Sequence, residues 1–365
     1  MGRYIFRRLL GLIPVMFIIS LITFFLMYLS PGDPAFIYLS QDGSVPTDEA
    51  LAAMHEELGL DKPVWEQYGA WLAGVVQGDL GTSYFTGNPV AEEIVTYFPN
   101  TFKLALLGMA LTLLISIPLG VFCATHENRF VDVLVRACSF VCGSLPGFLA
   151  AMLLIYVLGI QLKLLPTVSS GKAIGIVMPA LALAITMSPS YIRQVRAAVL
   201  DEMSEGYVRM LRARGIKERW ILYRNVLKSI MPSILTIAGL SMGQLLGGTA
   251  IIEIVCTYQG LGRLAVNSIT NRDYPLMQGF VLMSATVYVL VNLLVDILHA
   301  ASDPRVRKHL EREGKGGGSR VFKRTTETLI QDEESDRCRK AVSGLGVRRR
   351  DHARAGCDRA GVRNA

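Results

Sequence analysis

Two single carboxylates and one pair of cysteines in this sequence are of a type and position that could support chemistry. Glu253 and Asp296 lie at the ends of strongly apolar stretches, where burying a charge is costly, so both are candidates for a polar pathway or a gate. An interfacial position of either carboxylate explains the sequence equally well. Cys138 and Cys142 are four residues apart, which places both thiols on one helix face and would suit a soft metal. Apolar packing is the commoner role of such a pair, and we predict that role.

Motifs of the common enzymes and nucleotide-binding proteins are absent from the sequence. It has no glycine-rich phosphate loop, no His-Glu-x-x-His zinc motif and no Gly-x-Ser-x-Gly nucleophile elbow. Its five histidines are scattered along the chain. A membrane-embedded hydrolase would need a nucleophile beside a base within the apolar stretches, and no such pair is visible. We therefore predict no catalytic residues, no bound cofactor and no metal site.

The composition indicates a membrane protein. Of 365 residues, 51% are hydrophobic and only 18% are charged, and the mean hydropathy is +0.39. These values are too apolar for an ordinary soluble domain. The net charge of +7 does not indicate nucleic acid binding, because the basic residues gather beside apolar stretches and in the C-terminal tail without interleaved aromatic side chains. Most of the six cysteines lie in apolar stretches, so no disulfide framework is expected.

Six apolar stretches are long enough to cross a bilayer as helices. They lie at residues 9–29, 101–124, 137–160, 174–190, 230–252 and 276–298. Pro14 and Pro118 predict kinks in the first and second stretches, and the third stretch contains Pro146. The predicted fold class is an all-α membrane protein with six transmembrane helices.

Basic residues orient these helices, because a surplus of Lys and Arg marks the cytoplasmic side. Arg3, Arg7 and Arg8 precede the first stretch, which is too long for the core of a signal peptide and lacks a good cleavage site. We predict a retained helix with its N-terminus inside. Strict alternation then places the chain after the sixth helix inside as well, so both termini are expected in the cytoplasm.

Residues 31–100 form a predicted extracytoplasmic segment between the first and second transmembrane helices. This segment carries ten Asp or Glu residues from Asp42 to Glu93 against a single lysine, Lys62. Capping residues and apolar spacing predict short helices at 47–58, 64–76 and 89–97, with a loop at 79–83. Such a segment could pack on the transmembrane helices or offer a docking surface.

Residues 193–228 form a basic loop between the fourth and fifth apolar stretches. The loop holds nine Lys or Arg residues and four Asp or Glu residues. Apolar residues recur through it at helical spacing, and Gly206 and Gly215 divide it into short helices. A helix with an apolar stripe and a basic rim suits a cytoplasmic partner. From composition alone, a solvated positive-inside loop is an equally good interpretation.

The chain beyond Lys308 has a different character. A flexible Gly314–Gly318 run is followed by mixed charges and an Arg-rich end with little hydrophobic period. These features predict a disordered basic tail over residues 309–365. Binding to anionic lipid headgroups is one possible role. We favour the simpler interpretation that this end is not a selected part of the fold, as after read-through or a shifted reading frame.

Several motifs follow one another in order from Met1 to about Arg307. They are RYIFRRLLGLIP (Arg3–Pro14), SPGDPA (Ser30–Ala35), LGLDKP (Leu58–Pro63), GDLGTSYFTGNPVAEEI (Gly78–Ile94), GYVRMLRARG (Gly206–Gly215), IIE (Ile251–Glu253), GLG (Gly260–Gly262) and DPR (Asp303–Arg305). In this order they resemble the permease subunits of the binding-protein-dependent ABC importers for dipeptides, oligopeptides and nickel. GDPAFIYL, QYGAWL, GQLLGGTAIIE and NRDYP are similar in particular to the nickel importer permease.

The resemblance implies the type I ABC importer permease fold and half of a translocation pathway. It divides the chain into an N-terminal transmembrane helix (1–30), the extracytoplasmic segment (31–100), a five-helix permease core (101–308) and the tail. It implies a nickel ion or nickel chelate as substrate. The alternative is di- or oligopeptides, since peptide permeases share the scaffold and a separate binding protein selects much of the specificity.

The resemblance also implies partners in the plasma (inner) membrane of a prokaryote. They are a second, homologous permease forming a heterodimer, two cytosolic ATP-binding subunits that hydrolyse ATP in place of this chain, an extracytoplasmic solute-binding protein and the lipid bilayer, with no nucleic acid. Two positions depart from the family pattern. Arg209-Met210-Leu211 stands where the coupling motif has Glu-Ala-Ala, and Gln259 stands where a proline precedes Gly-Leu-Gly.

By the same resemblance, residues 193–228 contain a coupling helix that seats in a cleft of an ATP-binding subunit. The implied roles are apolar contact for Tyr207, Met210 and Leu211, rim charge for Arg212 and Arg214, and a helix-ending turn for Gly215.

Overall fold

The structure is a computed structural model that describes residues 2–29, 31–40, 43–169 and 173–302. Within these ranges every regular element is helical, and the only strand-like pairing is an isolated bridge between Thr82 and Pro89. Arg7–Asp303 forms one compact unit. The predicted tail, residues 309–365, lies outside the described residues.

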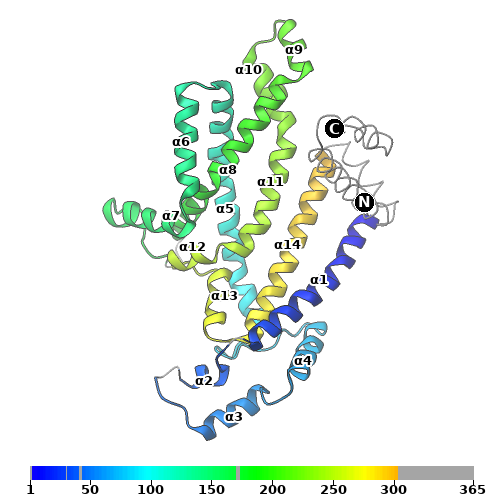
Figure 1. Ribbon diagram of the computed structural model, residues 1–365, viewed down its shortest axis with the longest axis vertical. Helices are drawn as coiled ribbons and strands as arrows, with labels where there is room; N and C mark the ends of the chain where they lie inside the picture. Colours follow the sequence, from blue (N-terminus) through cyan, green and yellow to red (C-terminus); the bar gives the residue numbers. More distant parts are fainter. Residues whose placement is uncertain (1, 30, 41–42, 170–172, 303–365) are drawn as a thin grey trace, which may run out of the picture. The chain divides into compact units, whose positions relative to one another are not determined.

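Figure 1 shows the order of the helices in this unit. The first half comprises α1 (Gly2–Leu29), α2 (Pro34–Leu39), α3 (Asp48–Leu58), α4 (Val64–Val76), α5 (Val90–Thr125), α6 (Phe130–Ser144), α7 (Gly147–Leu154) and the π-helix η1 (Ile155–Gln161). The second half comprises the 3₁₀ turn η2 (Ala173–Ile176), α8 (Val177–Ser204), α9 (Gly206–Ala213), α10 (Glu218–Trp220), the π-helix η3 (Ile221–Val226), α11 (Leu227–Gly248), α12 (Ala250–Val255), α13 (Leu261–Thr270) and α14 (Tyr274–Ser302).

Five helical stretches of the described chain are long and apolar enough to cross a membrane. They are Leu10–Leu29, Val90–Thr125, Ile174–Ser204, Glu218–Gly247 and Tyr274–Val295. A sixth is obtained when α6 and the α7–η1 pair count as one broken span, bent by 103°. The six predicted spans are recovered on this count, but the span predicted at 137–160 is broken into two helices instead of running through Pro146 as one.

The break between α6 and α7 has a local cause. Leu145 precedes a proline, and the proline ring disfavours helical geometry at the residue before it. Leu145 is accordingly extended, with φ −78° and ψ 126°, and Pro146 then starts α7. The chain turns sharply here instead of continuing along the axis of α6 (Figure 1).

Helix α5 is longer than the sequence predicts. The short helix expected at 89–97 and the span expected at 101–124 form one helix of 36 residues with Pro99 and Pro118 inside it. A proline inside a helix costs about 3 kcal/mol. The long contact between α5 and α8 offsets this cost (Figure 1). Small residues make that contact close, because a Cβ on Gly120 would lie 2.7 Å from the Val195 side chain.

The short helices predicted at 47–58 and 64–76 are confirmed as α3 and α4, while their extracytoplasmic location stays a prediction. Thr47 caps α3 by accepting a hydrogen bond from the Ala50 N–H, and α4 follows Pro63. Tyr68 of α4 is buried against α1, where its hydroxyl lies 3.0 Å from that of Ser20 and its ring meets Phe24 edge to face. Of the two roles left open for this segment, packing on a transmembrane helix is therefore observed.

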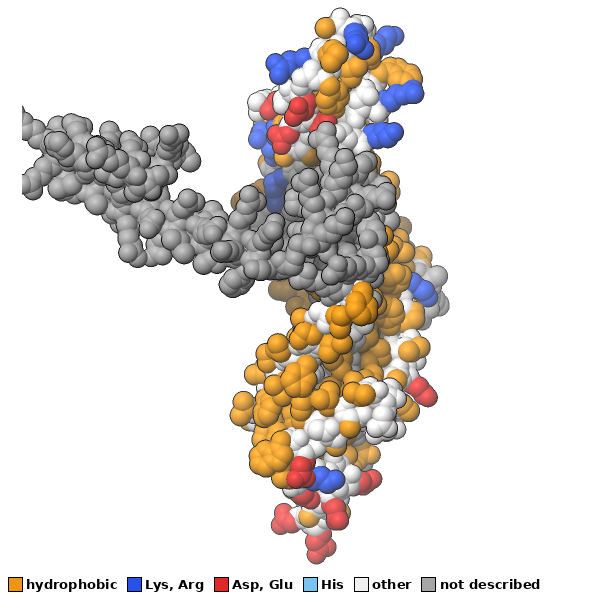
Figure 2. Space-filling view, turned by 90° about the vertical axis from the view of Figure 1, so that its right-hand side faces the viewer, with side chains coloured by type: hydrophobic (Ala, Val, Ile, Leu, Met, Phe, Trp, Pro, Cys, Tyr) orange, Lys and Arg blue, Asp and Glu red, His pale blue; other side chains and the backbone are white. Residues whose placement is uncertain are grey.

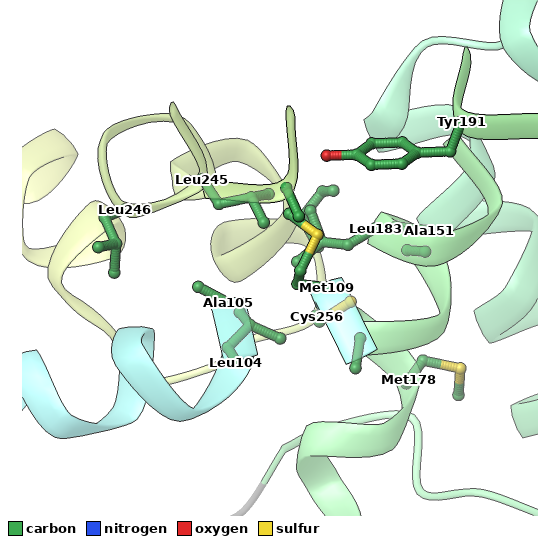
Figure 3. Packing of buried hydrophobic residues seen from close by; sticks show 14 residues of the cluster. Leu104, Ala105, Met109, Ala151, Met178, Leu183, Tyr191, Leu245, Leu246 and Cys256 are labelled. Carbon is green, nitrogen blue, oxygen red and sulfur yellow. The ribbon is translucent and has the colours of Figure 1, made fainter. Parts of the chain in front are cut away.

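Three buried apolar clusters hold the unit together. The central cluster joins α5, α7, α8, α11 and α12, and Figure 3 shows Leu104, Met109, Leu183 and Leu245 converging within it. The second cluster, called here the inner cluster, lies around α9 and η3 and consists of Val121, Ala124, Val195, Val199, Val208, Ile221, Leu222, Val226, Ile230 and Ile234. The third lies at the opposite end, where Val90, Ile94, Leu261 and Leu276 join α5, α13 and α14. Each buried Leu, Ile or Val contributes about 1.5 to 3 kcal/mol.

Candidate functional site

The basic loop predicted at 193–228 is mostly helical and forms one end of the unit, called here the inner end (Figure 1). Helix α8 ends at Ser204, and Glu205 is extended, so α9 leaves in a new direction. Val208 of α9 is fully buried in the inner cluster, and half-buried Tyr207 and Leu211 pack against that cluster. The amphipathic face of α9 is therefore occupied largely by its own chain.

Tyr207 is held in place by a polar contact as well. Its hydroxyl donates a hydrogen bond of 2.7 Å to the Glu202 carboxylate at the end of α8. Burial of the ring, and then this carboxylate, raise the pKa of Tyr207 to about 12. The hydroxyl stays a neutral donor at physiological pH, and its hydrogen bond links the start of α9 to the end of α8.

The other predicted coupling residues face outward. Met210 is 52% exposed, and Arg212, Arg214 and Gly215 are exposed. Arg212 bonds through Nε to Glu218 Oε1 at 2.6 Å, linking α9 to α10. Gly215 has φ +78°, a conformation that favours glycine, and its N–H donates to the Arg212 carbonyl at 2.9 Å. It ends α9 in a tight turn.

The sequence reasoning missed an exposed aromatic surface beside this turn. Trp220 and Tyr223 are 57% and 64% exposed, and the Arg224 guanidinium carbon lies 5.4 Å from the centre of the Trp220 ring. With Arg219 they line a depression of about 410 Å³. The apolar residues predicted to form a helical stripe in this loop include Trp220, Ile221 and Tyr223, but Ile221 is fully buried in the inner cluster while the two aromatic side chains are exposed.

A buried ion pair supports the inner end. Asp132 at the start of α6 is fully buried and receives two hydrogen bonds from Arg196 of α8, at 2.9 Å and 3.0 Å. The Asn128 N–H donates to the same carboxylate at 3.0 Å, and Arg136 approaches it at 3.5 Å. The two-pronged geometry is the strong form of an Arg–carboxylate contact, and it joins α6 to α8.

At the opposite end, called here the outer end, Glu253 is fully buried within the chain. Its Oε1 accepts hydrogen bonds of 2.8 Å from the hydroxyls of Thr101 and Thr249, and its Oε2 accepts one of 3.0 Å from the Arg263 N–H. Thr101 in turn accepts from the Leu261 N–H at 2.7 Å. The carboxylate therefore neutralises the N-terminus of α13 and ties it to α5 and α12.

The Gly-Leu-Gly motif is explained by this burial. A Cβ on Gly260 would lie 2.5 Å from the Glu253 carboxyl carbon, and one on Gly262 would lie 2.5 Å from the Ala250 backbone. Only glycine lets α13 approach α12 this closely. Glu253 was predicted as a pathway or gating residue. The geometry instead makes it an anchor, and its role in gating stays a prediction.

Asp273 forms a second buried anchor at the outer end. It precedes α14 and accepts hydrogen bonds from the Ser83 hydroxyl and from the backbone N–H groups of Tyr84 (3.2 Å), Phe85 (3.4 Å) and Leu276 (3.3 Å). Burial raises the pKa of Asp273, while the hydrogen bonds act in the opposite direction. The next residue back, Arg272, donates to the Pro31 carbonyl. The NRDYP motif thus joins the SPGDPA and GDLGTSYF motifs, which are far away in sequence.

The remaining predicted residues are not brought together. Asp296 lies in α14, and its side chain is outside those described. Cys138 is exposed, Cys142 is half-buried and both are free thiols. Among the described residues, no group of three or more His, Cys, Asp or Glu side chains could hold a metal ion.

The two ends carry opposite charge around an apolar middle. Figure 2 shows mostly Asp and Glu side chains at one end, mostly Lys and Arg side chains with a few acidic ones at the other, and apolar side chains over much of the described surface between them. Together with the helices that are long and apolar enough to cross a membrane, these features define a polytopic membrane protein.

Comparison with known proteins gives the family. Residues 116–308 match the family described as the binding-protein-dependent transport system inner membrane component, and residues 1–105 match its N-terminal part. The glutathione transport system permease protein GsiC of Escherichia coli K12 is 36% identical over 307 residues, which cover 84% of this chain and 99% of that protein. The GsiC protein of Shigella dysenteriae serotype 1 matches to the same extent.

The chain belongs to the permease subunits of the binding-protein-dependent ABC importers, in the peptide and nickel family. A solved structure of the inward-facing MetNI methionine ABC transporter shares the fold. It is 18% identical, has a TM-score of 0.50 and covers 58% of this chain and 96% of that one. The chain is thus a multi-pass inner-membrane transport subunit that works with ATP-binding subunits and a solute-binding protein and has no enzymatic activity of its own.

Proposed function

We propose that this chain forms half of the translocation pathway of an ATP-driven importer for small peptides. The supporting observation is the 36% identity over 84% of the chain to permeases named for glutathione, which is itself a tripeptide. The nickel interpretation rests on four short motifs, whereas the likeness to the glutathione permeases extends along almost their whole length. Peptides are therefore the better-supported substrate.

The proposed pathway is completed by a second, homologous permease. The exposed apolar side chains on the unit's middle, such as Phe140, Phe148 and Leu153, would then face either that partner or lipid. The basic inner end and both chain termini would face the cytoplasm, following the surplus of Lys and Arg. The acidic outer end would face the solute-binding protein.

In this arrangement α9 is the element that the ATP-binding subunits move. Its outward face offers Met210 with Arg212 and Arg214 to a cleft, while Val208 and Leu211 anchor it in the inner cluster. That cluster joins α9 to α5, α8, η3 and α11, so a push on α9 would move the inner ends of these helices together. Alternation between inward-open and outward-open states would follow from this movement.

An uptake experiment tests the substrate. Cells in which this chain is deleted and then restored would be given radiolabelled glutathione or a dipeptide, and separately radioactive nickel. We expect deletion to abolish peptide uptake, restoration to return it and an excess of unlabelled dipeptide to compete. Nickel uptake that is lost on deletion and insensitive to dipeptide would refute the peptide proposal and restore the nickel one.

A substitution in α9 tests the coupling role. Met210→Asp places a charge on the exposed face without disturbing the buried Val208, and we expect the ATP-binding subunits to be lost from the purified complex. Val45→Asp is the matched control, because Val45 is 86% exposed in the outer segment. A Tyr207→Asp and Leu211→Asp variant would be less informative, since both residues pack on the inner cluster. Full assembly and uptake in Met210→Asp would exclude this face of α9 as the contact.

A further inference from the structure

A groove of about 570 Å³ opens between α5 and the start of η3 and α11 at the inner end of the unit. One wall is formed by the last turns of α5, from Ile117 to Thr125, and the other by side chains between Leu222 and Leu227. The lining side chains are apolar apart from the hydroxyl groups of Thr125 and Tyr223. Both walls belong to helical stretches that are long and apolar enough to cross a membrane. The groove is therefore part of the surface that a bilayer would surround.

The length of the groove matches one leaflet of a bilayer. The rise from Ile117 to Thr125 along α5 is about 12 Å at about 1.5 Å per residue. The hydrocarbon core of a bilayer is about 30 Å thick, so each leaflet contributes about 15 Å. Thr125 is the last residue of α5. The groove therefore begins at the inner end and extends over most of the depth that the acyl chains of that leaflet fill.

The depression of about 410 Å³ described above adjoins this groove, because Tyr223 lines both. Its other lining side chains are Arg219, Trp220 and Arg224. The Arg224 guanidinium lies over the Trp220 ring, and a stacked guanidinium keeps its in-plane N–H groups available to a phosphate. Trp and Tyr are enriched at the headgroup level of membranes. The depression thus combines two cations with two aromatic rings suited to that level.

No carboxylate competes for the two arginines of the depression. Within the described part of the chain, no Asp or Glu lines either the groove or the depression, and neither arginine forms an ion pair. The acidic residues nearest in sequence are engaged elsewhere. Arg212 bonds to Glu218 at 2.6 Å, and Arg196 lies 3.8 Å from Glu127. The depression is therefore positively charged, and an anion is the ligand that suits it.

We infer that the groove and the depression together bind one anionic phospholipid of the cytoplasmic leaflet. Its phosphate would accept hydrogen bonds from Arg219 and Arg224, and one acyl chain would lie in the groove against Leu119, Phe122 and Leu227. The inference rests on the orientation given in the proposed function, in which the inner end faces the cytoplasm. It does not depend on which substrate is transported.

Other occupants fit only part of this surface. A free anion would use the arginines but not the apolar groove. An ATP-binding subunit is soluble, so it could contact the depression but could not enter a groove that lies at the depth of the acyl chains. A second permease could cover the groove, but it would have to supply carboxylates for the two arginines beside it. A lipid supplies both the chain and the negative charge.

The test measures binding of phosphatidylglycerol and of phosphatidylcholine to the complete transporter by native mass spectrometry. We expect the wild type to bind phosphatidylglycerol about tenfold more tightly, and Arg219→Gln with Arg224→Gln to remove this preference by raising that Kd about tenfold or more. Arg129→Gln with Arg193→Gln is the matched control, because both arginines are exposed near the inner end and line neither cavity. It should change the Kd less than about twofold.

A second variant tests the groove itself. Leu119 is 36% exposed, so Leu119→Trp should fold and fill part of the groove. We expect it to raise the Kd of both lipids about fivefold, because the acyl chain loses apolar contact. Leu114→Trp is the matched control, since Leu114 lies on the same helix, is 70% exposed and does not line the groove. It should leave both Kd values unchanged.

Three outcomes would overturn the inference. Equal Kd values for the two lipids in the wild type, unchanged in every variant, would mean that another subunit covers the groove. Inorganic phosphate that binds as tightly as phosphatidylglycerol, with Leu119→Trp having no effect, would reveal a site for anions alone. Loss of the ATP-binding subunits from Arg219→Gln with Arg224→Gln, at an unchanged lipid Kd, would assign the depression to those subunits.

These results are separable from the proposed function. Lipid binding is measured without substrate or solute-binding protein, whereas peptide uptake by the wild type tests the proposed function. A transporter that takes up peptide but shows no lipid preference would refute only the inference. One that binds phosphatidylglycerol as expected but takes up no peptide would refute only the proposed substrate.

Discussion

The outer and inner ends of this protein are held by different forces. At the outer end, two fully buried carboxylates, Glu253 and Asp273, collect neutral donors from segments far apart in the chain. At the inner end, α9 and η3 rest on a cluster of Val, Ile and Leu side chains, while the buried Asp132–Arg196 pair joins α6 to α8 beside them. The outer loops are held by directional hydrogen bonds, whereas α9 and η3 are held mainly by apolar packing.

The difference bears on which end can move. A buried carboxylate with three or four donors has one good arrangement, because any displacement leaves polar groups unpaired in a region of low dielectric. Apolar side chains can slide past one another by small amounts at little cost, as in shear motions between packed helices. We therefore expect the outer end to stay rigid while α9 and η3 follow the ATP-binding subunits.

The largest effect is predicted for Glu253→Ala. This change leaves the Thr101 and Thr249 hydroxyls and the Arg263 N–H without their acceptor, and an unsatisfied buried donor costs about 1 to 3 kcal/mol. We expect a loss of about 4 kcal/mol or more in the free energy of unfolding in mixed micelles, by the sum of these terms.

The matched change at the inner end is Val208→Ala, which removes two methyl groups from an equally buried site. A loss of about 2 kcal/mol is expected from the apolar area and the cavity. Equal losses for the two variants would contradict the contrast between polar and apolar support. If Glu253 instead has a role in the translocation pathway, the Glu253→Gln variant should have normal stability but defective uptake.

The second prediction compares two Arg–carboxylate pairs that both lie near the inner end. Asp132 and Arg196 form a two-pronged pair with the carboxylate fully buried, whereas Arg212 and Glu218 have side chains 41% and 60% exposed. Removing one partner of a buried pair costs about 3 to 5 kcal/mol. An exposed pair contributes about 0 to 1 kcal/mol.

Double-mutant cycles with alanine at each position measure both couplings in the same chain. We expect Asp132 and Arg196 to show a large coupling energy that hardly depends on salt. Arg212 and Glu218 should show a small one that decreases further as salt rises. A salt-sensitive, small coupling for Asp132 and Arg196 would mean that α6 and α8 separate readily, so the rigid support would have to lie elsewhere.

Much of the fold follows from local signals. Thr47 and Pro63 start α3 and α4 where capping rules place them, and the long apolar stretches became helices. The 103° break after α6 could not be read from Pro146, because a proline in an apolar stretch permits either a kink or a complete turn. Tertiary contacts of α7 decide between them.

The candidate sites were less predictable for a related reason. Glu253 was recognisable as an unusual carboxylate, but its main partner, Thr101, is 152 residues away in the chain. In the sequence, Glu93 resembles the other acidic residues of segment 31–100. Its burial could not be predicted, because the residues that surround it, between 264 and 276, are far away in the chain. At the inner end, Ile221 and Tyr223 are two residues apart and therefore lie on opposite faces of a helix, so the burial of Ile221 and the exposure of Tyr223 could have been predicted from their spacing.

The smallest predicted effect concerns the turn that ends α9. Gly215 has φ +78°, where an L-residue is strained by about 1 kcal/mol, so Gly215→Ala should destabilise this turn by that amount. Gly206 begins α9 without a positive φ, and a Cβ there would meet nothing within 4 Å. Gly206→Ala should therefore be neutral or stabilising by about 0.5 kcal/mol.

The two variants, Gly215→Ala and Gly206→Ala, test whether binding of the ATP-binding subunits requires the turn that ends α9 or only the helix itself. Hydrogen exchange of residues 206–216 would report the local opening, and co-purification of the ATP-binding subunits would report the contact. We expect Gly215→Ala to speed exchange at the end of α9 and to weaken co-purification, with Gly206→Ala doing neither. If Gly215→Ala speeds exchange but the ATP-binding subunits remain fully bound, the contact depends on the start of α9 and its outward face rather than on the turn. The turn at the inner end would then tolerate local disorder. The buried carboxylates at the outer end, Glu253 and Asp273, would not, because disorder there would break their hydrogen bonds.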